Sequence, residues 1–317
     1  MRGGLTDITG LKVGVYTDRE AITGVTVVLT GEGARAAVDV RGSAPGTRET
    51  DLLKPGRLVE RVQAIVLAGG SAFGLDAATG VVRYLAEQGI GFPVGPYNVP
   101  IVPAAVIFDL FIGDGSKRPD AAMGYQACLN ASEDPVPEGS VGAATGATVG
   151  KLYGPLQAVK SGQGSAACRC GDLIVAALVV VNAFGDVFDR SGKLLAGPRG
   201  PETDAMEQTV PLLLARNGNV TPGNTTLGVV ATNAALTREA LEKVAQMAHD
   251  GLARTIRPVH TLWDGDTIFA LSLGEASADV SWVGIAAVEA VAEAVERAIL
   301  TAQTLGGLPV AGELKIK

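Results

Sequence analysis

The stretch Gly223-Asn-Thr-Thr-Leu-Gly-Val-Val-Ala-Thr-Asn233 joins a loop directly to an apolar run rich in β-branched residues. The preceding loop, residues 217–224, contains proline and glycine, which favour turns. This change of pattern predicts a strand that begins at Thr225. Two adjacent threonines, Thr225 and Thr226, stand at the junction behind Asn224. Packing is a poor explanation for a hydroxyl at the start of such a strand, so Thr225 is a candidate nucleophile.

Regular elements are predicted on both sides of this strand. Upstream, the continuous apolar run 172–181 is typical of a fully buried strand and ends at Asn182. Downstream, we expect a helix capped by Thr237, a strand over 267–273 and a long Ala/Val-rich helix over 282–305. The alternation of strands and helices predicts a layered α/β protein with one domain, residues 1–317.

The other segments of the chain are less regular. Residues 25–29 and 36–40 are short β-rich runs, which we predict to form a hairpin around the turn at 30–33. Segments 89–120 and 188–223 are rich in proline or glycine and are predicted to be loops and irregular packing segments. The second of them is expected to link two parts of one domain.

A glycine-rich loop, residues 69–74, lies between a predicted strand over 62–67 and a predicted helix over 75–88. Strand, glycine-rich loop and helix in this order can bind phosphate. The GxGxxG spacing and a lysine are both absent from this loop, which argues against a nucleotide site. The loop is then either a tight turn or one wall of a substrate pocket, with Phe73 and Gly70 as candidate substrate-binding residues.

Two polar residues each leave two interpretations open. Lys151 follows the small-residue run 141–150, whose spacing does not fit a Walker A loop. It is either a solvated surface charge or a functional lysine. Asn182 ends a predicted buried strand and is either a turn former or a hydrogen-bond donor aimed into a pocket.

Two carboxylates, Asp264 and Asp266, flank Gly265 at the start of the predicted strand 267–273. One interpretation is an Asp-Gly turn that caps the strand. The other is a carboxylate pair that orients and tunes a nearby nucleophile or amine. The spacing of a calcium-binding EF-hand loop is absent, and no metal site is predicted.

Composition narrows the class of protein. The 317 residues are 47% hydrophobic, which allows one large core or two small ones. The net charge is -7, and the sequence lacks the basic cluster of a nucleic-acid binder. The longest apolar run, residues 173–181, is too short to span a bilayer, and the N-terminal residues lack the apolar region of a signal peptide. Cys168 and Cys170 do not have CxxC spacing. We therefore expect a cytoplasmic protein with reduced cysteines and no nucleic-acid or membrane partner.

The combined motifs resemble a known family, the L-aminopeptidase/D-esterase (DmpA-like) family of N-terminal-nucleophile hydrolases. Within this family the pattern is most similar to the 6-aminohexanoate-oligomer (nylon-oligomer) endohydrolases, because the candidate nucleophile is threonine where many aminopeptidase members have serine. The resemblance covers most of the chain and rests on the segments Gly69–Leu75, Gly150–Lys151, Gly162–Gly164, Val179–Asn182, Gly223–Thr226, Val230–Asn233, His260–Thr261 and Asp264–Thr267.

The resemblance implies an α-β-β-α sandwich, a fold type shared with ornithine acetyltransferases. It also implies self-cleavage between Asn224 and Thr225, giving an α chain (1–224) and a β chain (225–317) that stay together. A tetramer of such αβ units is expected. No metal or organic cofactor is expected.

The same resemblance implies a role for each matching residue. Thr225 would be the nucleophile, and the α-amine freed by cleavage would be its base. Asn182 would donate a hydrogen bond to the oxyanion. Lys151 would lie near the nucleophile and lower the pKa of the amine or stabilise negative charge. Asp264 and Asp266 would position Thr225 and assist proton transfer.

The implied activity is hydrolysis of amide bonds in small peptides, amino-acid amides or 6-aminohexanoate oligomers, through an acyl-enzyme. Two alternatives remain. One is an acyl transferase of the ornithine-acetyltransferase type, which would pass the acyl group to an amine. The other is a non-catalytic relative that binds small molecules.

Overall fold

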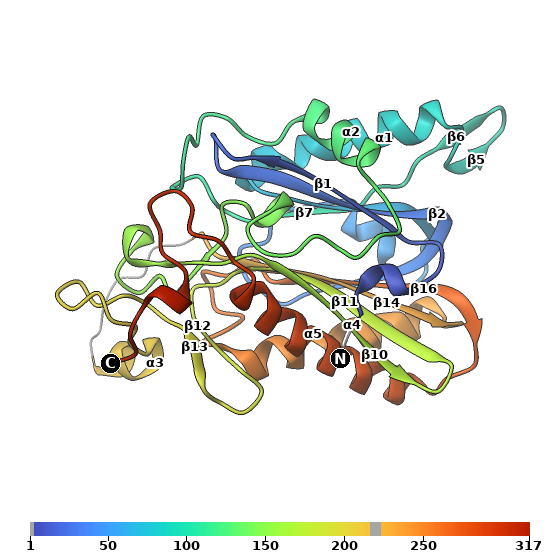
Figure 1. Cartoon of the computed structure of the whole chain (residues 1–317). Coiled ribbons are helices and arrows are strands. Elements are labelled where there is room, and N and C mark those ends of the chain that lie inside the picture. Colours follow the sequence, from blue (N-terminus) through green and yellow to red (C-terminus); the bar gives the residue numbers. More distant parts are fainter. Residues whose placement is uncertain (1–2, 216–222) are drawn as a thin grey trace.

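Four layers build the protein, which is known from a computed structural model that describes residues 3–215 and 223–317 (Figure 1). Two sheet layers lie face to face, and a pair of helices covers each outer surface. The first pair is α1 (Ala77–Glu87) and α2 (Ala121–Leu129). The second pair is α4 (Arg238–Thr255) and α5 (Val280–Leu300). The predicted α-β-β-α sandwich is therefore confirmed.

One long strand, β2 (Thr23–Val40), belongs to both sheet layers. Its first half pairs with β1 (Lys12–Asp18) and β4 (Arg61–Ala68), and its second half pairs with β16 (Thr267–Ala276). The predicted hairpin around residues 30–33 is therefore wrong. Glycines with φ of +60° and +111° at positions 31 and 33 interrupt the register with β4 without reversing the chain.

The strand order explains how the site is assembled. One layer has the order β1-β2-β4-β7-β3, and the other has the order β10-β11-β14-β16-β2. Strand β14 runs antiparallel to β11 and parallel to β16. The remaining bounds in these layers are β3 (Thr47–Arg48), β7 (Ala104–Val106), β10 (Gln163–Cys170), β11 (Leu173–Asn182) and β14 (Thr225–Ala234).

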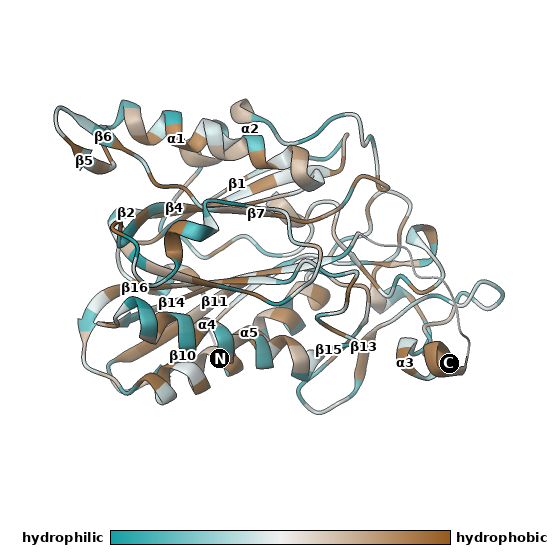
Figure 2. Cartoon of the chain, turned by 180° about the vertical axis from the view of Figure 1, so that it is seen from behind, coloured by the Kyte–Doolittle hydropathy of each residue, from teal (hydrophilic) through white to brown (hydrophobic). Residues whose placement is uncertain are grey.

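The alternation of side chains along β14 fills two cores. Leu227 and Val229 face the other sheet and pack in the same core as Phe269. Val230 and Ala234 point the opposite way, into the core beneath α4 and α5. Successive side chains of a strand point to opposite faces of its sheet, so β14 is buried on both faces. Figure 2 shows hydrophobic residues along the strands between the helix layers.

The strongly patterned elements agree with the prediction. Thr237 caps α4, and its side chain accepts a hydrogen bond from the Ala240 amide at 3.3 Å. The last long helix ends at Leu300 and not near residue 305, because Thr301 already forms its C-cap. Among the described residues, no helix combines the length and apolar character needed to cross a membrane.

The segments predicted as irregular contain short elements. β7 joins the main sheet, and a separate hairpin is formed by β5 (Phe92–Val94) and β6 (Tyr97–Val99). Such short elements are decided by tertiary pairing and carry little local pattern. The others are β8 (Thr148–Val149), β9 (Val159–Lys160), β12 (Asp186–Phe188), β13 (Leu194–Ala196), β15 (Ile256–Arg257), α3 (Thr209–Ala215) and the 3-10 helices at Leu5–Asp7, Thr50–Leu53, Ser71–Asp76, Gly142–Ala144, Pro155–Gln157 and Ala311–Glu313.

Candidate active site

Sheet topology brings three distant segments to one point. Because β11 and β14 are antiparallel, the last residue of β11, Asn182, lies opposite the first residue of β14, Thr225. Because β14 and β16 are parallel, their starts also meet, and Asn224 forms a bridge with Asp264 just before β16. Asn182, Thr225 and Asp264 are thus gathered at one end of the second sheet layer.

The carbonyl oxygen of Asn224 accepts two hydrogen bonds. The Thr225 hydroxyl donates to it at an O···O distance of 2.5 Å, and the Gly265 amide donates at 2.9 Å. The peptide bond between Asn224 and Thr225 therefore has a hydroxyl and a backbone donor at its own carbonyl. A backbone N–H aimed at a carbonyl oxygen is the element from which oxyanion holes are built.

Gly265 is a further candidate site residue, which the sequence predicts only as part of a turn. A Cβ atom at this residue would lie 2.7 Å from the Thr225 hydroxyl oxygen and 2.7 Å from the carbonyl oxygen of Ala44. Only glycine allows so close an approach of the backbone to the hydroxyl. The sequence signal that could have identified Gly265 is its position between Asp264 and Asp266.

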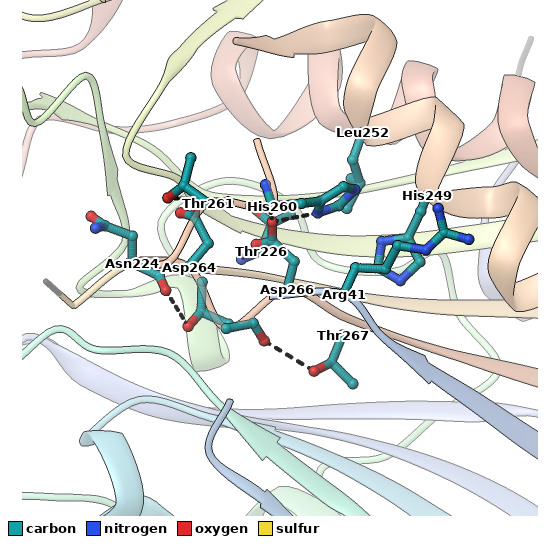
Figure 3. Close-up of polar contacts among 12 residues, drawn as sticks. Arg41, Asn224, Thr226, His249, Leu252, His260, Thr261, Asp264, Asp266 and Thr267 are labelled. Atoms are coloured by element: carbon teal, nitrogen blue, oxygen red, sulfur yellow. Dashed lines mark hydrogen bonds and ion pairs between the residues drawn. The ribbon is translucent and has the colours of Figure 1, made fainter. Parts of the chain in front are cut away.

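The two carboxylates are held by separate sets of donors (Figure 3). Asp266 accepts hydrogen bonds from the Thr226 amide at 2.7 Å, the His260 amide at 3.1 Å and the His260 Nδ1 at 2.8 Å. Asp264 accepts from the amide and hydroxyl of Thr261, at 2.9 Å and 2.6 Å. His260 and Thr261 belong to the motifs that carry the family resemblance, but the sequence predicts no role for either.

The surroundings of Asp264 favour its protonated form. Burial raises the pKa of this carboxyl above its ordinary value, and the neighbouring charge of Asp266 adds to the effect, although the Thr261 hydrogen bonds oppose it. A carboxyl that holds its proton more readily can donate that proton, so Asp264 is suited to proton transfer beside Thr225.

Lys151 points into the protein and is not a solvated surface charge. Its ammonium donates to the side-chain oxygen of Asn182 at 2.8 Å and to the backbone oxygen of Asn182 at 3.1 Å. Burial lowers the pKa of Lys151 to about 7, while Asp264, Asp109 and Asp266 oppose this shift. A lysine with such a pKa is partly neutral near pH 7 and can act as a base.

Asn182 is fully buried at the end of β11, so it is not a turn former. Its side-chain oxygen accepts hydrogen bonds from Lys151 and from the Thr148 amide, at 2.8 Å and 3.1 Å. Its side-chain nitrogen donates to the carbonyl of Phe108 at 3.1 Å. The geometry gives Asn182 the task of holding Lys151, and its role as an oxyanion donor stays a prediction.

A cleft of about 280 Å³ opens beside Thr225. Among its described lining residues, none has a charged side chain, and the wall is mainly apolar. The glycine-rich loop contributes Ser71 and Ala72, whereas the two predicted contacts are not among the lining residues. Phe73 stacks beneath the Arg118 guanidinium at 3.8 Å, and the Gly70 amide donates to buried Asp109 at 2.7 Å. Substrate contact by either stays a prediction.

A second, narrow crevice of about 20 Å³ lies on the Lys151 side of the same segment. Phe108, Gly223 and Asn224 line both this crevice and the larger cleft, so the two spaces adjoin. The described residues contain no group of three or more His, Cys, Asp or Glu side chains placed to hold a metal ion.

Comparison with known proteins gives consistent results. Residues 4–310 match the sequence profile of peptidase family S58. An uncharacterized aminopeptidase of Mycobacterium tuberculosis is 44% identical over 339 residues, which covers 96% of each chain. A 6-aminohexanoate-oligomer endohydrolase of Agromyces sp. is 33% identical over 280 residues, which covers 85% of this chain and 74% of the relative.

The fold has solved counterparts. The L-aminopeptidase D-Ala-esterase/amidase of Ochrobactrum anthropi, described as a new variant of the Ntn-hydrolase fold, superposes with a TM-score of 0.72. The superposition covers 98% of this chain and 90% of that one at 21% identity, which establishes a shared fold.

Proposed function

The chain belongs to peptidase family S58, and on this premise we propose that it is a self-processing amide hydrolase with Thr225 as its nucleophile. One observation carries the proposal. The Thr225 hydroxyl lies 2.5 Å from the carbonyl oxygen of the preceding residue, and the Gly265 amide donates to that same oxygen. A nucleophile and an oxyanion donor therefore already meet at one peptide bond.

Self-cleavage proceeds by an N-to-O acyl shift. The neutral amine of Lys151 removes the hydroxyl proton of Thr225, whose oxygen attacks the carbonyl carbon of Asn224. The Gly265 amide stabilises the oxyanion that forms. The C–N bond then breaks, and the Lys151 ammonium returns the proton to the nitrogen of Thr225, which becomes an amine. Water hydrolyses the resulting ester and leaves chains 1–224 and 225–317.

Cleavage also creates the catalytic base for turnover. An α-amine has an ordinary pKa of about 7.7–8.0, so a sizeable fraction is neutral near pH 8. The freed amine of Thr225 can accept the proton of its own hydroxyl when that oxygen attacks a substrate amide. The acyl group passes to Thr225, the substrate amine leaves, and water releases the acid. Asp264 and Asp266 assist these proton transfers.

The mainly apolar wall of the cleft supports small amides with apolar acyl chains as substrates. Aliphatic amides such as 6-aminohexanoate oligomers fit this chemistry, and the Agromyces relative is named for that activity. The tetramer implied by the resemblance and the cytoplasmic location expected from composition remain parts of the proposal.

Electrophoresis under denaturing conditions tests self-processing. The wild type should give two bands that correspond to residues 1–224 and 225–317, and Thr225→Ala should give one full-length band. Hydrolysis of a panel of amino-acid p-nitroanilides, short peptides and 6-aminohexanoate oligomers then tests the substrate class. A purified wild-type chain that stays full length would contradict the proposal.

A further inference from the structure

His260 makes two contacts with one oxygen of the Asp266 carboxylate. Its backbone amide donates at 3.1 Å and its ring Nδ1 lies at 2.8 Å. The other carboxylate oxygen accepts the amide of Thr226, the residue next to the candidate nucleophile, at 2.7 Å. Asp266 thus connects His260 on one side with the start of β14 on the other. The imidazole itself does not line the cleft beside Thr225.

The backbone of His260 has an uncommon conformation. Its φ of +55° is in the left-handed region, which few residues other than glycine adopt without strain. This conformation is what directs both the amide and the ring of one residue toward the same carboxylate. Strained residues are retained where their surroundings require them, and they cluster at functional sites.

The imidazole of His260 packs against the ring of His249, the other histidine of the chain. The ring of His249, on α4, lies beside it (Figure 3) and meets it edge to face, with 4.8 Å between ring centroids. His249 Nε2 lies 3.0 Å from the backbone oxygen of Asp39. Within the described structure, His260 Nε2 is buried and has no hydrogen-bond partner. The one polar contact of the ring is therefore the one with Asp266, so packing alone does not explain a histidine here.

We propose that His260 is a positioning residue, which uses its Nδ1–H to fix the Asp266 carboxylate against the Thr226 amide and so keeps Thr225 aligned. The proposal rests on the function proposed above. It assigns His260 no contact with the substrate or with the reacting atoms. Its loss should therefore slow the chemical step and leave substrate binding unchanged.

Two substitutions separate the hydrogen bond from ring packing. His260→Asn keeps a side-chain N–H donor on the same atom position, and asparagine tolerates a positive φ. His260→Gly also accepts the backbone conformation but has no donor. Both remove the ring contact with His249, and glycine also removes the rest of the side chain.

The rates of self-cleavage and turnover provide the readout. We expect His260→Gly to lower the self-cleavage rate and kcat by about 10- to 100-fold, the range for loss of one hydrogen bond to a charged group. We expect His260→Asn to stay within about threefold of the wild type, because its amide restores that bond. KM should be unchanged in both. Equal losses in the two variants, or an effect confined to KM, would overturn the proposal.

A spectrum of the wild-type protein reports the tautomer of each histidine ring, and the His260→Asn variant assigns the two rings. The chain contains 2 histidines, so a ¹⁵N spectrum of histidine-labelled protein shows only two ring systems. We expect one ring to be protonated at Nδ1 and to lose that signature in His260→Asn. A His260 ring protonated only at Nε2 would refute the proposal even if the wild type showed no hydrolysis. Failure of self-cleavage alone would refute the proposed function instead.

Discussion

Replacing Gly265 with alanine tests whether the backbone beside Thr225 takes part in self-cleavage. The new Cβ would lie 2.7 Å from both the Thr225 hydroxyl oxygen and the Ala44 carbonyl oxygen, closer than real Cβ contacts. Relieving such overpacking costs about 1–3 kcal/mol. The hydroxyl or the Gly265 amide must move to relieve it, and each is placed at the carbonyl that is to be cleaved. Since 1.36 kcal/mol is a factor of ten in rate, we expect self-cleavage about 5- to 150-fold slower.

The assay is a time course of full-length chain on denaturing gels, started from cell-free synthesis so that newly made precursor is visible. Gly312→Ala is the matched control, because a Cβ there meets no atom within 4 Å. Circular dichroism melting curves show whether each variant is folded. A folded Gly265→Ala chain that cleaves at the wild-type rate would refute the assignment of Gly265 to the reacting centre.

Two further predictions concern the base and the core. Self-cleavage should accelerate about tenfold from pH 6 to pH 8, because Lys151, with a pKa of about 7, is protonated and inactive below that pH and becomes a neutral base above it. Gel time courses at each pH measure this, Lys151→Met should abolish it, and a flat profile would exclude Lys151 as the base. In a Thr225→Ala background, Phe269→Ala should lower the free energy of unfolding by about 3–5 kcal/mol, because Phe269 is fully buried between the sheets. Urea denaturation measures the loss, and a loss below about 1 kcal/mol would contradict the packing described.

The sequence predicted the elements whose pattern is set by burial. Runs such as 172–181 and 225–233 are apolar on both faces and have one reasonable structure, a central strand. The helix cap at Thr237 was also predictable, because its hydroxyl accepts a hydrogen bond from the first turn of the helix that follows it. Strand β2 was not predictable in this way. Glycines with positive φ fit a reversal as well as a bulge, and only the pairing of its second half with β16 decides between them.

In the candidate site, too, local motifs were predictable from the sequence and contacts between distant segments were not. Thr225, Asp264 and Asp266 were chosen from short motifs, and parallel pairing of β14 with β16 places their segments together. The contact of Lys151 with Asn182 depends on how a loop folds back over the end of β11, which no spacing in the sequence encodes. The contact of Asp266 with His260 depends on a single backbone dihedral angle.

The order of strands has a consequence for the cleaved protein. In the second layer, β14 and β16 come from residues 225–317, and they lie between β11 and β2, which come from residues 1–224. The shorter piece is thus threaded into the sheet of the longer one and shares a ladder of backbone hydrogen bonds with it on each side. Separating the pieces would expose unpaired strand edges at both seams simultaneously. A break after Asn224 would free a new chain end while the architecture keeps the two polypeptides interlocked as one folding unit.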